Sequence, residues 1–493
     1  MNAALALPVA APLLGAAVTV LVRRLVVQRI VSFAALTVSI AASVAVLVEV
    51  IRADRVVVSR LGGWPASVAI TLVADRLSAL MLVVAVAVVT IVLIYAIGQR
   101  AADERSPAYH PVYLVLGAGI AQAFLAGDLF NLFVAFELLL VASYVLLTLE
   151  GADDQIRAGT TYVVLNVIES TLLLTAIGLV FAATGTVSMA ELPERLAALP
   201  DAVRSGLNLL LLIAFGIKAA VFPLYFWLPD AYPTAPSSVT AVFAGLLTKV
   251  GVYAMLRTET LLFPGGHSTL LLVIAGFTMI VGVLGAISHS SMKRILSFHI
   301  VSQIGYMVLG IGIGTPAALA ATVFYLLHHI PVKTSLFLVA GIVERETGTS
   351  SSVGVGGLAR RSGVLAVLFL IPALSLAGLP PFSGFLAKYA ILRAGFDEGL
   401  WIVSIAALVG GLLTLVSMTK IWTGLFWGEI EPPVPAGRVG VLRHHRVMAG
   451  ATTMIILATL LIAVAAGPLY RFCIDAAAQL SDPFVYIRAV RGS

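Results

Sequence analysis

The sequence has little charge and almost no cysteine. Only 11% of its 493 residues are Asp, Glu, Lys or Arg, whereas soluble globular proteins average about 25%. Apolar residues make up 60% of the chain and form long runs over almost its whole length, which excludes a soluble domain and indicates a polytopic membrane protein. The one cysteine, Cys473, excludes an internal disulfide and any cysteine-based metal or iron–sulfur site. The net charge of +6 is spread over short loops and gives no basic stripe for a nucleic acid.

Lysine is also scarce, and its placement is unusual. Only Lys293 lies in an evident loop, and the other five lysines lie inside or at the ends of apolar segments: Lys218, Lys249, Lys333, Lys388 and Lys420. A lysine at mid-bilayer costs about 2.5–3.5 kcal/mol even on the most lenient insertion scale. An amine can release its proton, whereas an arginine stays charged at any accessible pH. These lysines therefore predict a protein that moves protons.

The apolar runs predict an all-α polytopic membrane protein with about fourteen transmembrane helices. The expected spans are 3–21, 30–51, 74–97, 111–126, 129–149, 159–183, 207–228, 236–257, 268–288, 296–314, 317–343, 364–394, 400–427 and 447–468. An even number places both termini on one side of the membrane. More Lys and Arg lie in the loops on the opposite side, so the positive-inside rule predicts that both termini are outside.

Prolines interrupt two of these spans in corresponding ways. Pro223 and Pro229 fall in the seventh segment, and Pro380 and Pro381 fall in the twelfth. Proline removes a backbone donor and clashes with the preceding turn, so both helices should break there. Paired interruptions in two halves of a chain indicate inverted repeats with a transport site between them. A break at membrane depth needs protein or water around its backbone, so we expect internal hydration.

Four parts follow from this pattern. Residues 1–110 hold helices 1–3, 111–257 the first five-helix inverted repeat, 268–428 the second, and 429–493 helix 14 with a C-terminal tail. Each broken helix has a lysine beside its break, Lys218 in the first and Lys388 in the second.

Glu137 lies in the middle of an apolar segment without a polar sequence neighbour. Its partner must come from another helix, and Lys218 is the natural candidate. An opposite charge favours ionisation and burial opposes it, so such a pair is suited to exchange protons when the pairing changes. Further along the chain Lys249 precedes Tyr253 by four residues, and His329 precedes Lys333 by four, which places each pair on one helix face. The predicted polar axis comprises Glu137, Lys218, Lys249, His329, Lys333 and Lys388.

Each of these polar residues, and several others, can be interpreted as structural or as functional. The axis residues could form only structural ion pairs, although ionisable groups in a membrane are functional by default. His299, Gln303, His328 and Glu169 are possible further members, and Asp128 is either a member or a helix N-cap. Lys420 lies near a membrane face and can snorkel to water. Cation sites favour carboxylates, and Asp128, Glu137 and Glu169 are the only membrane-depth candidates. We expect no bound metal and no cofactor.

Several long motifs resemble one known family. GDLFNLFVAFELLLVASYVLL (127–147) is similar to its fifth helix, KAAVFPLYFWLPDAYPTAPSSVTAVFAGLLTKVGVYAMLR (218–257) to helices 7 and 8, SMKRILSFHIVSQIGYM (291–307) to the junction of helices 9 and 10, HHIPVKTSLFLVAG (328–341) to helix 11, and SLAGLPPFSGFLAK (375–388) to helix 12. The family is that of the antiporter-like subunits shared by Mrp-type cation/proton antiporters and the membrane arm of respiratory complex I. Within it, the motifs look most like the D-type subunits of Mrp antiporters.

The resemblance implies a fold of fourteen helices with two inverted five-helix repeats. It also implies that the family's essential glutamate is Glu137, that its helix-7 and helix-8 lysines are Lys218 and Lys249, that its helix-11 pair is His329 and Lys333, and that its helix-12 charge is Lys388. One departure is Gln303, where relatives often carry histidine, and His299 could replace it.

Three functions remain open at this point. The leading hypothesis is a proton-translocating subunit of a multisubunit Mrp-type Na⁺(K⁺)/H⁺ antiporter in a bacterial cell membrane, with other membrane subunits as partners. The alternatives are a proton-pumping subunit of complex I or of a membrane-bound hydrogenase, and a scaffold subunit that does not pump. The sequence lacks a nucleophile–base pattern or a phosphate loop, so we expect a transporter subunit and not an enzyme.

Overall fold

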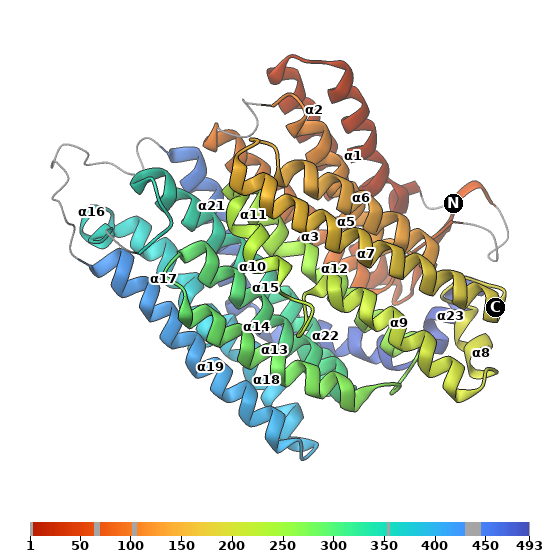
Figure 1. The fold of residues 1–493 in the computed structure, drawn as a ribbon. Coiled ribbons are helices and arrows are strands. Elements are labelled where there is room, and N and C mark those ends of the chain that lie inside the picture. The colour runs from red at the N-terminus through yellow and green to blue at the C-terminus, as the bar shows by residue number, and fades with distance from the viewer. Residues whose placement is uncertain (1–2, 64–69, 101–105, 353–354, 429–444, 493) are drawn as a thin grey trace.

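The computed structural model describes residues 3–63, 70–100, 106–352, 355–428 and 445–492, and these form a bundle of helices with one small hairpin (Figure 1). The helices are α1 (Ala3–Leu21), α2 (Leu25–Ala53), α3 (Arg76–Gln99), α5 (Tyr109–Leu125), α6 (Leu129–Leu147), α7 (Asp153–Thr184), α8 (Leu192–Ala197), α9 (Asp201–Ala219), α10 (Trp227–Ala231), α11 (Ser237–Val242), α12 (Thr248–Leu261), α13 (Ser268–Ser288), α14 (Met292–Ile313), α15 (Pro316–Thr347), α16 (Leu358–Arg361), α17 (Gly363–Ala377), α18 (Ser383–Asp397), α19 (Trp401–Ile421), α21 (Arg446–Val464), α22 (Ala466–Ser481) and α23 (Pro483–Arg491). The antiparallel strands are β1 (Val57–Arg60) and β2 (Thr71–Ala74).

The helices agree with the predicted fold class. Within the described residues, 12 helices are long and apolar enough to cross a membrane. Two shorter apolar helices, α5 and α17, occupy the remaining expected segments. The prediction of an all-helical, multi-pass membrane protein is confirmed, and the count of fourteen crossings stays a prediction.

Helix α15 runs through the centre of the bundle. Its 32 residues span about 48 Å at 1.5 Å per residue, which exceeds the roughly 30 Å core of a bilayer. Its membrane-spanning part is entirely buried, with α11, α14, α17, α18, α21 and α22 packed around it. By contrast, α1, α2, α7 and α19 lie at the periphery and are only 33–39% buried. Polar side chains on α15 therefore face protein and not lipid.

The first predicted interruption is present. Helix α9 ends at Ala219, and the next helix, α10, begins only at Trp227, with Pro223 between them. Pro229 was expected to break a helix as well, and that expectation is wrong. It lies within the first turn of α10, where no intrahelical hydrogen bond needs its missing N–H group.

The second interruption separates α17 from α18, and Pro380 and Pro381 lie between them as predicted. Gly378 directly follows α17 and has a φ of +86°, a left-handed backbone conformation that favours glycine. At the start of α18, Gly384 is so close to α17 that a Cβ atom would lie 1.7 Å from the Ser375 carbonyl oxygen. Glycine at this position allows the two half-helices to approach each other.

Two features of the fold were not expected from the sequence. The eighth segment, α11 with α12, contains a π-helical turn at Phe243–Leu247. The expected C-terminal tail forms α22 and α23, and α22 packs against α15 through a buried face that includes Cys473 and Leu480. The expected boundary at 429 falls in 429–444, outside the described residues. Both termini lie at the same end of the bundle (Figure 1).

Candidate functional site

Lys218 occupies the last turn of α9 beside the first helix break, and it forms a buried ion pair with α7. Its Nζ atom lies 3.6 Å from Glu169 Oε2 and donates a hydrogen bond of 3.4 Å to Asn166 Oδ1. The ammonium also stands 5.4 Å from the centroid of the Phe136 ring. The Lys218 and Glu169 side chains are 2% and 1% exposed, so each charge depends on the other for its stabilisation.

Glu137 was expected to pair with Lys218, and the structure gives it a different partner. The ion-pair partner of Lys218 is Glu169, while Glu137 Oε1 accepts a hydrogen bond from the hydroxyl of Ser170. Glu137 nevertheless lies within electrostatic range of Glu169. Its side chain is only half-buried on α6. The result is a triad of two carboxylates and one amine in which Glu169 is within electrostatic range of both Glu137 and Lys218.

Lys249 lies directly after the π-helical turn and is completely buried. Its Nζ atom donates a hydrogen bond of 2.5 Å to the Ala244 carbonyl and one of 3.4 Å to Thr248 Oγ1. A π-helical turn changes the regular hydrogen-bond ladder and leaves a carbonyl available to a side chain. Local helix distortion, which the sequence did not predict, thus supplies the acceptor for this lysine.

His329 and Lys333 lie one turn apart on α15, as their spacing predicted. Lys333 Nζ donates a hydrogen bond of 2.9 Å to the Leu296 carbonyl of α14. Within the described part of the chain, both ring nitrogens of His329 lack a hydrogen-bond partner. This buried imidazole has Lys249, Lys333 and Lys388 within electrostatic range, so it occupies the centre of the lysine group.

Lys388 connects the two halves of the second broken helix. From α18 it donates hydrogen bonds of 2.9 Å to the Leu376 carbonyl and 3.1 Å to the Ala377 carbonyl, both in the last turn of α17. Carbonyls at a helix C-terminus have no intrahelical partner and carry the negative end of the helix dipole. Lys388 satisfies them, and it also lies 5.3 Å from the Tyr306 ring centroid.

The possible members around Lys388 form a buried polar layer. His299 Nε2 lies 2.5 Å from Ser417 Oγ, and His328 Nδ1 lies 2.8 Å from Ser383 Oγ at the start of α18. Gln303 Oε1 accepts a hydrogen bond of 2.6 Å from the Tyr325 hydroxyl. All three candidates are therefore engaged with polar groups close to the second break.

Two other charged residues have structural roles. Asp128 is the N-cap of α6 and accepts a hydrogen bond of 2.6 Å from the Asn131 backbone, in agreement with the capping interpretation. Lys420 does not reach for water, because it donates to the Ile287 and His289 carbonyls at 2.7 and 2.8 Å. It therefore caps the end of α13.

Lys293 was expected in a loop, and that expectation is wrong. It lies in the first turn of α14 with its side chain 4% exposed. Its Nζ atom is 2.6 Å from Glu344 Oε2 on α15, and the same oxygen accepts a hydrogen bond from Ser237 at 3.1 Å. This network joins α11, α14 and α15 near a membrane face.

The predicted axis thus falls into two groups. Glu137, Glu169 and Lys218 form the first, on α6, α7 and α9, which pack in that order. The second comprises Lys249, His329, Lys333 and Lys388, with His299 and His328 beside them. The groups meet where α9 packs on α12, since a Cβ atom on Gly251 would lie 2.6 Å from the Ala219 nitrogen.

Sequence reasoning missed residues that support the first group. Asn166 lies three residues before Glu169 on α7 and contacts Lys218. Ser170 lies one residue after Glu169 and contacts Glu137. Polar residues at i, i+3 and i+4 share a helix face, so the sequence around Glu169 could have predicted a polar face on this helix. The buried ion pair of Arg257 with Asp75, at 2.6 Å, was also missed, because its partners are far apart in the sequence.

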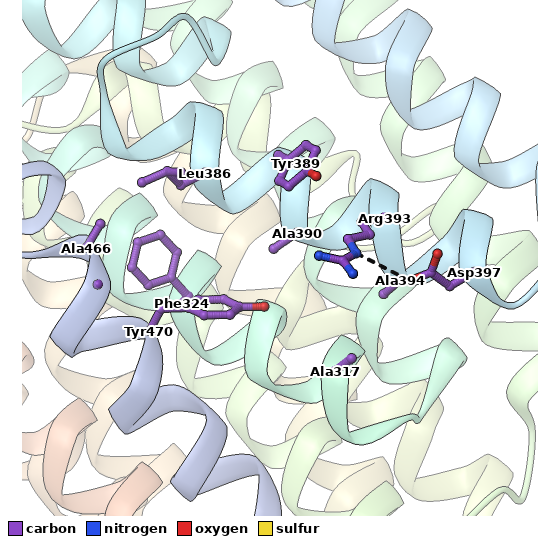
Figure 2. A pocket seen from close by; sticks show the side chains of 11 residues that line it. Ala317, Phe324, Leu386, Tyr389, Ala390, Arg393, Ala394, Asp397, Ala466 and Tyr470 are labelled. Carbon is purple, nitrogen blue, oxygen red and sulfur yellow. Dashed lines mark ion pairs between the residues drawn. The ribbon is translucent and has the colours of Figure 1, made fainter.

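A cavity of about 420 Å³ lies apart from these groups, between α15, α18 and α22 (Figure 2). Phe324, Leu386 and Tyr470 line it, and the ion pair of Arg393 with Asp397, at 3.5 Å, stands at its side. No axis residue lines this cavity, which is mainly apolar.

The fold defines a multi-pass membrane protein, and ionisable side chains are buried in its interior. Residues 126–414 match the family model described as "NADH:quinone oxidoreductase/Mrp antiporter, TM". The chain is 42% identical to the D-type subunit of the Na⁺/H⁺ antiporter of Alkalihalophilus pseudofirmus strain OF4, and 37% identical to its counterpart of the same name in Bacillus subtilis strain 168. Each match covers 99% of both chains. The chain belongs to the NADH:quinone oxidoreductase/Mrp antiporter transmembrane family, and it is a transporter and not a catalytic enzyme.

Solved structures give the same assignment. A chain of the Mrp complex from Dietzia sp. DQ12-45-1b superposes with a TM-score of 0.93 over 100% of both chains, at 36% identity. A chain of an archaeal membrane-bound sulfane sulfur reductase superposes with a TM-score of 0.89 at 24% identity, over 99% of this chain and 100% of the other. The second likeness concerns the fold alone.

Proposed function

We propose that this chain is the D-type, proton-translocating subunit of a multisubunit Mrp antiporter, and that it works by secondary antiport. It exchanges protons for Na⁺ or K⁺ together with other membrane subunits. The names of the relatives that match over almost their full length support this assignment, as does the likeness to a chain of the Mrp complex.

One observation carries the proton-path part of the proposal. The Lys218 ammonium, at the end of a broken helix, is paired with Glu169 and has Glu137 as a second carboxylate nearby. Of the two, only Glu169 is paired with the amine, and Glu137 lies within electrostatic range of Glu169, so the two carboxylates repel each other unless one of them binds a proton. Movement of Lys218 away from Glu169 weakens the pairing that keeps the amine charged, so Lys218 releases its proton and the carboxylates become better proton acceptors. The triad can therefore couple a small displacement of α9 to proton uptake and release.

The second group would carry the proton further. Lys249, Lys333 and Lys388 each donate to backbone carbonyls and surround His329. Three ammonium groups so close repel one another, so deprotonation of one stabilises the charge of the next. We propose that a proton passes along Lys249, His329, Lys333 and Lys388, with His299, Gln303 and His328 positioning the far end.

The two-unit organisation belongs to the same proposal. Units 111–257 and 268–428 would be inverted repeats, each with one broken helix and one lysine beside its break, and the termini would lie outside the cell. Each unit has a lysine beside its break, Lys218 in the last turn of α9 before the first break and Lys388 in α18 after the second, and this supports the division.

Exchange measurements test the proposal. The complete complex, with Glu137→Gln or Lys218→Ala in this chain, is reconstituted into vesicles, and Na⁺/H⁺ exchange is driven by a pH gradient. We expect exchange to be lost in both variants, and we expect Glu137→Gln, which leaves the Lys218–Glu169 pair intact, to assemble normally. Normal exchange in both variants would overturn the assigned role, and loss of assembly in both would favour a scaffold. Peripheral redox subunits purifying with the chain would favour the complex I alternative.

A further inference from the structure

A second polar site lies at the membrane face where α9 begins and α12 ends. A cavity of about 210 Å³ opens there, and Asp201, Ser205, Asn208 and His267 are among its lining residues. Asn208 is 1% exposed, so its side chain is buried at the inner wall of the cavity. Neither the axis nor the matched family motifs assign a role to this position.

Glu259 lies beside Asn208, in the last turn of α12, and is 7% exposed. The Asn208 amide N–H₂ group faces the Glu259 carboxyl, but this contact does not satisfy all the polar atoms of the two side chains. Across the described residues, Asn208 Oδ1, Asn208 Nδ2 and Glu259 Oε1 have no hydrogen-bond partner at bonding geometry. Buried polar atoms are almost always bonded, and each unbonded one costs about 1–3 kcal/mol. A bond from Asn208 Nδ2 to Glu259 still leaves Asn208 Oδ1 without a donor, because an ionised carboxylate only accepts. A group from outside the described residues must therefore bond this oxygen.

The chemistry of these atoms selects water over a metal ion. The set contains a donor, Asn208 Nδ2, and two acceptors, Asn208 Oδ1 and Glu259 Oε1. Water donates and accepts, so it can bond each of the three whichever way the amide is turned, whereas Na⁺ or K⁺ can contact only the two oxygens. A cavity of this size has room for several waters, since each occupies about 30 Å³ in the liquid.

Glu259 is a poor place for a fixed negative charge. It lies near the C-terminus of α12, where the helix dipole is negative. Glu259 does not itself line the cavity but lies beside the lining residue Asn208. Water that bonds Asn208 is suited to exchange a proton with this carboxyl, its carboxylate accepting a proton from hydronium and returning it as the carboxylic acid ionises. Gly266 keeps the site open, because a Cβ atom there would lie 2.5 Å from Asn208 Nδ2.

We propose that this cavity is a water-filled proton port, in which Glu259 exchanges the proton and Asn208 orients the water. The inference rests on the proposed function and adds an entry point to it. Asn208 lies about 15 Å along α9 from Lys218, and Glu259 about 15 Å along α12 from Lys249, at 1.5 Å per residue. The buried residues Leu211, Phe215 and Met255 lie on the turns between the port and the lysines. This apolar layer separates the port from the lysines, and a proton can pass between them only when water enters the layer.

Cysteine labelling tests whether the cavity is hydrated. Asn208→Cys is made in the complete complex after Cys473→Ala removes the native cysteine of this chain. A small, water-soluble thiol reagent is added to sealed vesicles, and the mass of this chain is measured. We expect rapid labelling of Asn208→Cys from one side only, and at least tenfold slower labelling of the matched control Leu211→Cys, which lies one turn deeper. Equal, slow labelling of both would overturn the port.

Exchange and cation competition test the role of Glu259. Glutamine cannot exchange a proton, so we expect Glu259→Gln to slow exchange on the order of tenfold, equivalent to about 1.4 kcal/mol in the barrier, and Glu259→Asp to restore most of the rate. The control is Glu398→Gln, an exposed carboxyl at the end of α18, which should leave exchange unchanged. Normal exchange in Glu259→Gln, with exchange lost in Lys218→Ala, would overturn the port and leave the proposed function standing. Protection of Asn208→Cys by Na⁺ would overturn the port in favour of a cation site.

Discussion

Lys218 and Glu169 form an almost fully buried ion pair, 3.6 Å apart, that joins the broken helix α9 to the peripheral helix α7. Removing one partner of such a pair leaves an uncompensated buried charge, which costs about 3–5 kcal/mol, whereas removing both costs much less. We therefore expect Glu169→Gln to destabilise the protein strongly and Lys218→Met to rescue it in the double variant.

The measurement is a double-mutant cycle on the thermal unfolding midpoint of the purified complex. Additive losses for the two substitutions would contradict the pairing. Glu398→Gln, at an exposed position at the end of α18, is the matched control and should change the midpoint little.

The hydrogen bond from Ser170 to Glu137 predicts a graded effect on transport. Hydrogen bonds to charged groups contribute about 1.5–3 kcal/mol, so Ser170→Ala should weaken the position of Glu137 without removing its charge. We expect Ser170→Ala to slow Na⁺/H⁺ exchange and Ser170→Thr, which keeps the hydroxyl, to retain most of it. Equal rates in Ser170→Ala and the unaltered complex would show that the bond has no role in transport.

Lys388 and Lys420 both donate to carbonyls at helix ends, yet we expect opposite results for them. Arginine keeps the charge and the donors but cannot release a proton. Lys388→Arg should therefore assemble and lose exchange, because the group is a proton carrier. Lys420→Arg should assemble and keep exchange, because that group only caps α13. A loss of exchange in both variants, or in neither, would contradict this distinction.

The close approach of the two half-helices at the second break predicts a severe effect of one methyl group. A Cβ atom on Gly384 would lie 1.7 Å from the Ser375 carbonyl oxygen, whereas one on Gly363 would meet nothing within 4 Å. Overpacking of this kind costs about 1–3 kcal/mol or more. Gly384→Ala should thus lower the yield of assembled complex, and Gly363→Ala should not. Similar yields of the two variants would show that the break tolerates expansion.

Most of the fold could be predicted from the sequence because hydrophobic length determines membrane helices. The breaks at Pro223 and at Pro380 and Pro381 were also readable, since proline acts locally. Pro229 was misread because a proline in the first turn of a helix is indistinguishable, by residue type alone, from one that ends it. Helix α22 was missed because it is too short and too polar to be a membrane span. It is held in place by packing, mainly against α15.

The site was harder to predict than the fold. The residue types of the axis could be named from the sequence, but the pairing of Lys218 with Glu169 depends on how α7 rotates against α9. The buried pairing of Lys293 with Glu344 depends in the same way on the packing of α14 against α15. The π-helical turn that supplies the acceptor for Lys249 leaves no residue signature such as proline. These features arise from tertiary packing, which one sequence does not reveal.

The central claim is that Lys218 works by releasing a proton, and the substitution Lys218→Arg tests it most directly. Arginine at this position keeps a positive charge for Glu169 but cannot be deprotonated. The measurement is pH-gradient-driven Na⁺/H⁺ exchange by the complete complex in vesicles, with Arg157→Lys, at an exposed position on α7, as the control. The account predicts an assembled complex with exchange abolished in Lys218→Arg and unchanged in the control. Exchange at the normal rate in Lys218→Arg would contradict it.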